Sequence, residues 1–133
     1  MVEGDAVNLI DMKAGIEHLG RRIPDRMDVI LGVLDYTLES VSIAKRMAEF
    51  CREAGIEYFY LILNKIGSKE VESMLIDKLS TLQDKIIGLI PYDQELIKAG
   101  LSGNALGECK ALEDIERMVE RLEQAVTSKE ETK

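Results

Sequence analysis

Acidic residues end two apolar runs in the first third of the chain, and each is a candidate for metal chemistry. Ala6–Asp11 (AVNLID) ends in Asp11, and Asp28–Asp35 (DVILGVLD) ends in Asp35. A carboxylate at the tip of a rigid strand can hold the water shell of a nucleotide-bound Mg²⁺. The same pattern is common in α/β proteins without such a role, and the simpler explanation of Asp35 is a helix-entry or loop acid.

The residue types that usually bind transition metals are sparse. His18 is the only histidine, and the two cysteines, Cys51 and Cys109, lie far apart without a CxxC partner. We therefore expect no metal cage built from this chain, and we expect reduced thiols, as in a cytoplasmic protein.

The chain also lacks a glycine-rich, lysine-containing loop that could cradle phosphates. Its one glycine-rich stretch, GLSGNALG at 100–107, contains no lysine and follows a predicted helix. Backbone amides in such a loop normally neutralise phosphate charge, so the sequence offers no phosphate site of this kind.

Four nearly continuous apolar runs predict the strands that would position the candidate residues. They are Ala6–Asp11, Asp28–Asp35, Tyr58–Asn64 and Lys85–Ile90. Runs of this kind are typical of strands buried on both faces of a sheet. Amphipathic stretches predict helices over Leu38–Ala54, Lys69–Leu82, a short segment ending at Ala99, and Leu112–Val126.

Residues at the expected helix ends support these boundaries. Thr37, Ser68 and Asp93 can cap N-termini, while Gly55 and Gly100 can end helices. Strands that alternate with helices predict an α/β fold with an open parallel sheet, in which ligands bind beyond the carboxyl ends of the strands. Those ends are Asp11, Asp35, Asn64 and Pro91.

Length and composition limit the class of protein. The 133 residues fit one α/β domain, which we place at 1–127 with a frayed tail at 128–133. No apolar run approaches the roughly 18 residues that a membrane helix needs. The net charge of −8 argues against nucleic-acid and anionic-membrane partners. An acidic polar face on Leu112–Val126 likewise favours packing on the sheet over membrane binding.

The string AGIEHLGR (14–21), which closely follows Asp11, resembles the switch region of a known ATPase family. This is the CooC family, which matures nickel-dependent carbon monoxide dehydrogenase and is a branch of the MinD/ParA-type deviant-Walker P-loop NTPases. Three further segments resemble the family in the same order, and the resemblance covers Asp5 to about Leu106. They are VLDYTLES (33–40), LNKI (63–66) and IPYD (90–93).

The resemblance implies a catalytic and switch role for the segment after the first predicted strand. Asp11 would hold Mg²⁺ through water, and Gly15 would sense the γ-phosphate. Lys13 departs from the family, which usually carries a glutamate there, and this charge reversal would weaken the role of Asp11.

The resemblance also implies a nucleotide-base site. Asn64 would read the adenine edge through its amide, and Lys65 would support either the base or the loop. Pro91, Tyr92 and Asp93 would wrap the base. Asn64 has an alternative explanation as a residue that ends a strand and caps the next turn.

In this family the phosphate loop and a metal-binding Cys-x-Cys pair lie upstream of the strand that ends in the magnesium-binding acid. The chain therefore resembles the C-terminal half: a partial P-loop NTPase fold of about four mostly parallel strands with flanking helices, without the phosphate-loop strand. We expect this chain alone neither to hydrolyse ATP nor to bind it tightly, and nickel or zinc not to bind through this half.

Two functions follow from the resemblance. The first is the nucleotide-base and switch portion of a cytoplasmic protein that uses ATP and Mg²⁺ to insert nickel into carbon monoxide dehydrogenase. Its expected partners are that dehydrogenase and either a homodimer partner or the missing phosphate-loop half. The second is a catalytically inactive module that docks a separate phosphate-loop subunit or the target enzyme. Without the phosphate-loop strand, we expect 6–11 to pair directly with 28–35 or with another chain.

Overall fold

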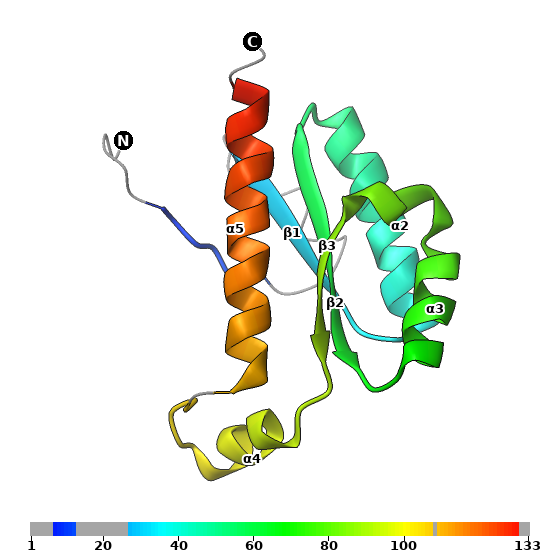
Figure 1. Cartoon of the computed structure of the whole chain (residues 1–133). Helices are drawn as coiled ribbons and strands as arrows, with labels where there is room; N and C mark the ends of the chain where they lie inside the picture. The colour runs from blue at the N-terminus through cyan, green and yellow to red at the C-terminus, as the bar shows by residue number, and fades with distance from the viewer. Residues whose placement is uncertain (1–6, 13–26, 108, 131–133) are drawn as a thin grey trace.

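The structure is a computed structural model that describes residues 7–12, 27–107 and 109–130 (Figure 1). Helices and strands alternate along most of this length. The elements are β1 (Val29–Leu34), α2 (Leu38–Glu53), β2 (Tyr58–Ile66), α3 (Lys69–Lys78), the 3-10 helix η1 (Ser80–Lys85), β3 (Ile86–Pro91), α4 (Gln94–Ser102) and α5 (Lys110–Glu130). Within the described ranges, no helix has the length and apolarity needed to cross a bilayer.

The described strands form one parallel sheet in the order β1-β2-β3, as the alternation of strands and helices predicted. β1 pairs with β2 without interruption from Val29–Tyr58 to Leu34–Leu63. The pairing of β2 with β3 shifts register twice, and the second shift lies between Leu63 and Ile66. β1 and β3 are therefore the edges of the described sheet.

The helices cover the two faces of the sheet unequally. α2 and α3 lie on one face, and α5 lies on the other, along β3 (Figure 1). On the α2 and α3 side, Val41, Ala44 and Cys51 are buried, so α2 packs one apolar face on the sheet, as the amphipathic pattern at 38–54 predicted. We call the opposite sheet face, which carries Leu31 and Val33 of β1, the open face.

The predicted helix caps are confirmed. Thr37, Ser68 and Asp93 each accept a backbone N–H from the first turn of the following helix, at 2.9 to 3.2 Å. Gly55 follows α2 with a φ of 71°, a left-handed conformation that glycine adopts without a Cβ clash.

The prediction of a strand at Ala6–Asp11 is wrong for the described residues 7–11, which belong to no strand. β1 pairs only with β2 among the described residues, so direct pairing of 7–11 with 28–35 is not formed. The apolar side chains here are exposed, 94% for Val7 and 88% for Leu9. A run of apolar residues needs a neighbouring strand for its backbone hydrogen bonds, and this segment has none in the described chain.

Four predicted boundaries also move. Pro91 is the last residue of β3 and pairs with Ile66, rather than breaking the strand before it, because an edge strand tolerates the missing N–H. The helix expected to reach Leu82 tightens into η1 after Lys78. α4 continues through Gly100 to Ser102, because Gly103, with a φ of 67°, supplies the left-handed end. α5 continues beyond the expected Val126 to Glu130.

Candidate functional site at the carboxyl edge of the sheet

The end of β2 contains a local distortion at Asn64 and Lys65. The register with β3 shifts between Leu63 and Ile66, and Lys65 has a φ of 56°. Left-handed backbone costs a residue other than glycine about 1–2 kcal/mol. Such outliers often occur at functional sites, where they direct a side chain.

Alternation along β2 places the Asn64 side chain on the open face. Phe59, Leu61 and Leu63 are buried on the α2 and α3 side, so the residues between them point the other way. Asn64 is half-buried in this position. Its amide carries a donor and an acceptor at the carboxyl end of the central strand.

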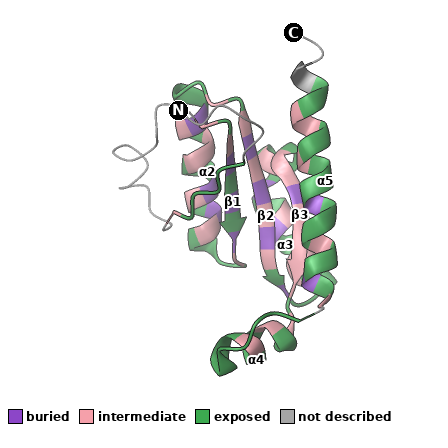
Figure 2. Cartoon of the chain, turned by 90° about the vertical axis from the view of Figure 1, so that its left-hand side faces the viewer, coloured by how far each residue is buried: buried purple, intermediate pink, exposed green. Residues whose placement is uncertain are grey.

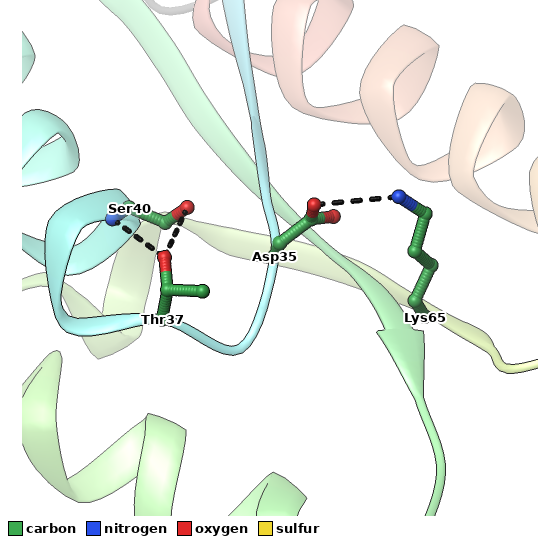
Figure 3. A network of polar contacts seen from close by, with 4 residues as sticks. All are labelled: Asp35, Thr37, Ser40 and Lys65. Atoms are coloured by element: carbon green, nitrogen blue, oxygen red, sulfur yellow. Dashed lines mark hydrogen bonds and ion pairs between the residues drawn. The ribbon is translucent and has the colours of Figure 1, made fainter.

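Lys65 forms an ion pair with the acid that follows β1. Its Nζ lies 3.4 Å from Oδ2 of Asp35, and the two side chains are 57% and 43% exposed (Figure 3). The contact joins the ends of two neighbouring strands that are thirty residues apart in the chain. Asp35 thus lies within reach of the end of β2, as the rule that the carboxyl ends of parallel strands meet at one edge of a sheet predicts.

The start of α2 lies beside this ion pair. Thr37 Oγ1 accepts the Ser40 N–H at 3.1 Å and donates to Ser40 Oγ at 3.0 Å (Figure 3). The Thr37 N–H donates to the Asp35 carbonyl at 2.9 Å, which closes the turn between β1 and α2. The positive end of the α2 dipole therefore lies at the same edge of the sheet as Lys65.

The loop after β3 joins the same edge. Pro91 pairs with Ile66, and the Tyr92 N–H donates to the Ile66 carbonyl at 3.0 Å. The structure thus brings the predicted residues Pro91 and Tyr92 beside the end of β2. Tyr92 is 49% exposed, so about half of this residue's surface is accessible to a ligand. Asp93 Oδ1 accepts the Glu95 N–H at 2.9 Å, so its carboxylate caps α4.

The predicted switch residues are not brought into this group. Asp11 is exposed and outside the sheet. Gly15 and Lys13 lie outside the described residues, so their predicted roles stay predictions. In the described part of the chain, no group of three or more His, Cys, Asp or Glu side chains could hold a metal ion.

A cavity of about 550 Å³ lies at the opposite end of the strands. Its lining comes from the second half of α2, the start of β2 and η1, and includes Lys45, Arg52, Phe59 and Lys85. We assign the candidate site to the carboxyl edge instead, because open parallel sheets bind ligands beyond the carboxyl ends of their strands.

The sequence is similar to known ATP-binding proteins. No family model matches it. It is 34% identical over 119 residues to one uncharacterized ATP-binding protein of Methanocaldococcus jannaschii, covering 89% of this chain and 46% of that protein. It is also 32% identical over 95 residues to the carbon monoxide dehydrogenase accessory protein CooC of Rhodospirillum rubrum, covering 71% of this chain and 35% of that protein. The chain spans less than half the length of these relatives.

The fold matches a solved structure. The MinD cell division protein of Aquifex aeolicus superposes with a TM-score of 0.61 at 22% identity, over 74% of this chain and 44% of that one. The α/β architecture with a parallel sheet and flanking helices is thus confirmed, and here too the match covers less than half of the other protein.

Proposed function

The chain is a relative of the CooC- and MinD-like P-loop ATPases, and we propose that it supplies the nucleotide-base and switch portion of such an ATPase. The observation that carries this proposal is the joining of Asn64 and Lys65 to Pro91 and Tyr92 at the carboxyl edge of the sheet. The sequence relation to ATP-binding proteins supports adenine as the ligand of this edge.

Asn64 has the chemistry to recognise adenine. Its amide can donate to a ring nitrogen and accept from the exocyclic amine at the same time. Tyr92 has an accessible aromatic ring, and base–aromatic stacking contributes about 1–3 kcal/mol per base. Asp93 acts in this proposal by starting α4 and thereby shaping the loop, because its carboxylate is engaged in the cap.

Lys65 and Asp35 act as positioning residues in this proposal. Their ion pair ties the loop after β1 to the distorted end of β2. Holding Lys65 in its left-handed conformation fixes the neighbouring Asn64 backbone, so the amide is pre-oriented before a base arrives.

The phosphates of ATP would be bound by another half of the ATPase, because this sequence lacks a phosphate loop. Mg²⁺ is usually held by one or two carboxylates together with nucleotide phosphates. Asp11 is exposed and outside the sheet, and the described part of the chain holds no group of three or more His, Cys, Asp or Glu side chains that could bind a metal ion, so Asp11 would need ligands from elsewhere. We propose Asp11 and Gly15 only as contributors to a site completed by the other half.

The finer proposal is that the complete ATPase serves nickel insertion into carbon monoxide dehydrogenase. Its support is the relation to the R. rubrum accessory protein. The test is whether the complete protein increases nickel-dependent activity of the co-expressed dehydrogenase in an ATP-dependent manner. An unchanged nickel content of the dehydrogenase would contradict it.

Base recognition can be tested in two steps. Calorimetry of the chain alone with ATP and Mg²⁺ should show no micromolar binding. A hybrid in which the chain replaces the matched segment of the M. jannaschii relative should bind ATP, and Asn64→Ala should weaken that binding on the order of tenfold, the loss typical of one bidentate base contact. Asn104→Ala, in an exposed loop, is the matched control. Equal ATP affinity in both variants would overturn the role of Asn64.

The second candidate function is a catalytically inactive module that docks a separate phosphate-loop subunit or a target enzyme. The outer edge of β1, which pairs with no other strand among the described residues, favours this candidate. An in-frame phosphate loop encoded directly upstream of Met1 would favour the ATPase portion, and a separate gene for it would favour the docking module.

A further inference from the structure

The cavity at the amino ends of the strands lies outside the nucleotide-base site and has no role in the proposed function. Its volume of about 550 Å³ falls within the range of small-molecule sites, about 300–1,000 Å³. Three segments that are far apart in the chain line it: the second half of α2, residues between 56 and 59 around the start of β2, and residues between 81 and 85 of η1. The cavity is therefore large enough for an organic molecule.

The inner wall of the cavity is apolar. Cys51 and Phe59 are 3% and 4% exposed, and Ile56 and Leu82 are partly buried against the same core. Figure 2 shows buried and exposed residues side by side along α2, which forms one wall. Ala48 contributes only a methyl group to this wall, so space remains beside it. An apolar body placed here would leave water for a preformed apolar surface.

The rim of the cavity is charged and mostly basic. Lys45, Glu49 and Arg52 follow one flank of α2 at spacings of four and three residues. Glu57 and Lys85 contribute from the other two walls. These three basic and two acidic side chains give the rim a net charge of +1, in a chain whose net charge is −8. The rim therefore favours an anion locally, against the charge of the whole chain.

The basic groups of the rim are available to a ligand. No salt bridge among the described residues involves Lys45 or Arg52, and Lys85 has only a 3.8 Å contact with Asp84, its neighbour in sequence. The carbonyls at positions 50–52 accept backbone N–H groups from the turn that follows α2. These carbonyls are therefore satisfied and compete little for the cations of the rim.

We propose that this cavity is a binding site for a small amphipathic carboxylate, whose apolar body lies against Phe59 and Leu82 and whose carboxylate contacts Arg52 at the basic rim. A guanidinium can bind a carboxylate through two parallel hydrogen bonds. The Thr81 hydroxyl, which also lines the cavity, can donate a further one. The site lies at the other end of the sheet from Asn64 and does not depend on the proposed function.

Inorganic phosphate and cationic amphiphiles fit this cavity less well. The helix end at the rim is the C-terminus of α2, which presents carbonyls rather than the free N–H groups that hold phosphate at helix N-termini. Phosphate would also leave the apolar wall without a partner. A cationic amphiphile could cover that wall, but its head group would face the excess of basic side chains.

The test is an NMR titration of the ¹⁵N-labelled full chain with octanoate. We expect saturable shifts of the amides that surround the cavity, such as those of Ala48, Phe59 and Leu82, and none at Asn64 or Tyr92. Octanol has the same chain without the charge and should bind about three- to tenfold more weakly, as expected for the loss of one partly exposed ion pair. Octylamine should bind more weakly still.

Two variants test the two parts of the site. Arg52→Glu replaces the attraction for the carboxylate with repulsion and should weaken octanoate binding about tenfold. Arg46→Glu is the matched control, because Arg46 is exposed on the same helix and does not line the cavity. Ala48→Phe should fill the cavity and abolish binding of octanoate and octanol alike. The urea midpoint of each variant shows whether its fold is intact.

The proposal stands if octanoate shifts the cavity amides and Arg52→Glu weakens its binding more than Arg46→Glu does. It is overturned if octanoate gives no saturable shifts, if octylamine binds as tightly as octanoate, or if the two charge reversals have equal effects. Shifts concentrated at Leu31 or Tyr92 would also overturn it, since they would place the ligand on another apolar surface. If Ala48→Phe lowers the urea midpoint strongly, the comparison of Arg52→Glu with Arg46→Glu decides the outcome.

Discussion

The two faces of the sheet receive similar apolar residues from the strands but differ in what covers them. On the α2 and α3 side, Leu34, Leu61 and Leu63 are at most 2% exposed. On the open face, Leu31 and Val33 are 37% and 59% exposed. The difference shows that burial depends on the neighbouring helices as well as on the strand's own sequence.

The covered face is what positions the candidate site. β1 and β2 are held in continuous register by the packed side, and their ends bring Asp35 and Lys65 together. The site can therefore be ordered while the open face lacks a cover. The predictions below test how far the two faces are independent, from the largest expected effect to the smallest.

Removing a side chain from the covered face should cost most. Leu61 is 0% exposed, so Leu61→Ala should lower the free energy of unfolding by about 2–5 kcal/mol through lost burial and a cavity. Leu31→Ala on the open face should cost about 1 kcal/mol, because much of that side chain is already in water. Urea denaturation of both variants measures the contrast, and equal losses would mean that the open face is covered in solution.

The packing of α5 on the open side of the sheet depends on a close approach at Gly88. A Cβ at this position would clash with the Met118 side chain, so Gly88→Ala should lower the free energy of unfolding by about 1–3 kcal/mol. Gly67→Ala, where a Cβ would meet nothing within 4 Å, is the control. Met118→Ala in the Gly88→Ala background should recover part of the loss, and a double-mutant cycle measures the coupling. Additive losses would contradict the contact.

The Asp35–Lys65 ion pair should contribute little to stability. Both side chains are substantially exposed, so Asp35→Ala should lower the free energy of unfolding by less than about 1 kcal/mol. Repeating the urea denaturation in 1 M salt should remove most of the difference, since salt screens exposed charges. A larger, salt-insensitive loss would show that Asp35 supports the turn into α2 rather than Lys65.

Cys51 should report on the covered face through its pH dependence. Burial raises the pKa of the Cys51 thiol above its ordinary value of 9.0, because the thiolate is poorly solvated inside the protein. Its contribution to stability is therefore complete below pH 9.0 and is lost as the pH rises above that value. Cys51→Ala should remove this part of the loss of stability at high pH. Urea denaturation of both proteins at a series of pH values from 8 upward measures the difference.

Alkylation provides a second measurement of the same residue. Cys51 should react with iodoacetamide more slowly than the half-buried Cys109, because its sulfur is less accessible. Mass spectrometry of time points gives both rates. Faster reaction at Cys51 would mean that α2 opens readily from the sheet.

Much of the local structure was predictable because its causes are local. Thr37, Ser68 and Asp93 begin helices through hydrogen bonds to residues two or three positions away, so the sequence is sufficient to identify them. The boundaries at Gly100 and Pro91 were less predictable. A glycine can lie within a helix when a second glycine, further along the chain, ends that helix. A proline can be the last residue of an edge strand.

The candidate site was predictable in part. The rule for strand ends identified Asn64 and Pro91, and the structure joins them through Ile66. The ion pair of Lys65 with Asp35 and the left-handed conformation of Lys65 had no local signal, because both depend on how neighbouring strands meet.

By itself, the sequence determined the alternation of strands and helices, the parallel sheet and the identity of the polar residues at the strand ends. Hydrophobic period and capping chemistry act over a few residues, so a linear reading detects them. Only the tertiary structure decided that 7–11 finds no strand partner in the described chain and that Leu31 and Val33 stay partly exposed there. Strand pairing and face covering are contacts between distant segments, and an apolar run indicates the need for a partner without identifying it.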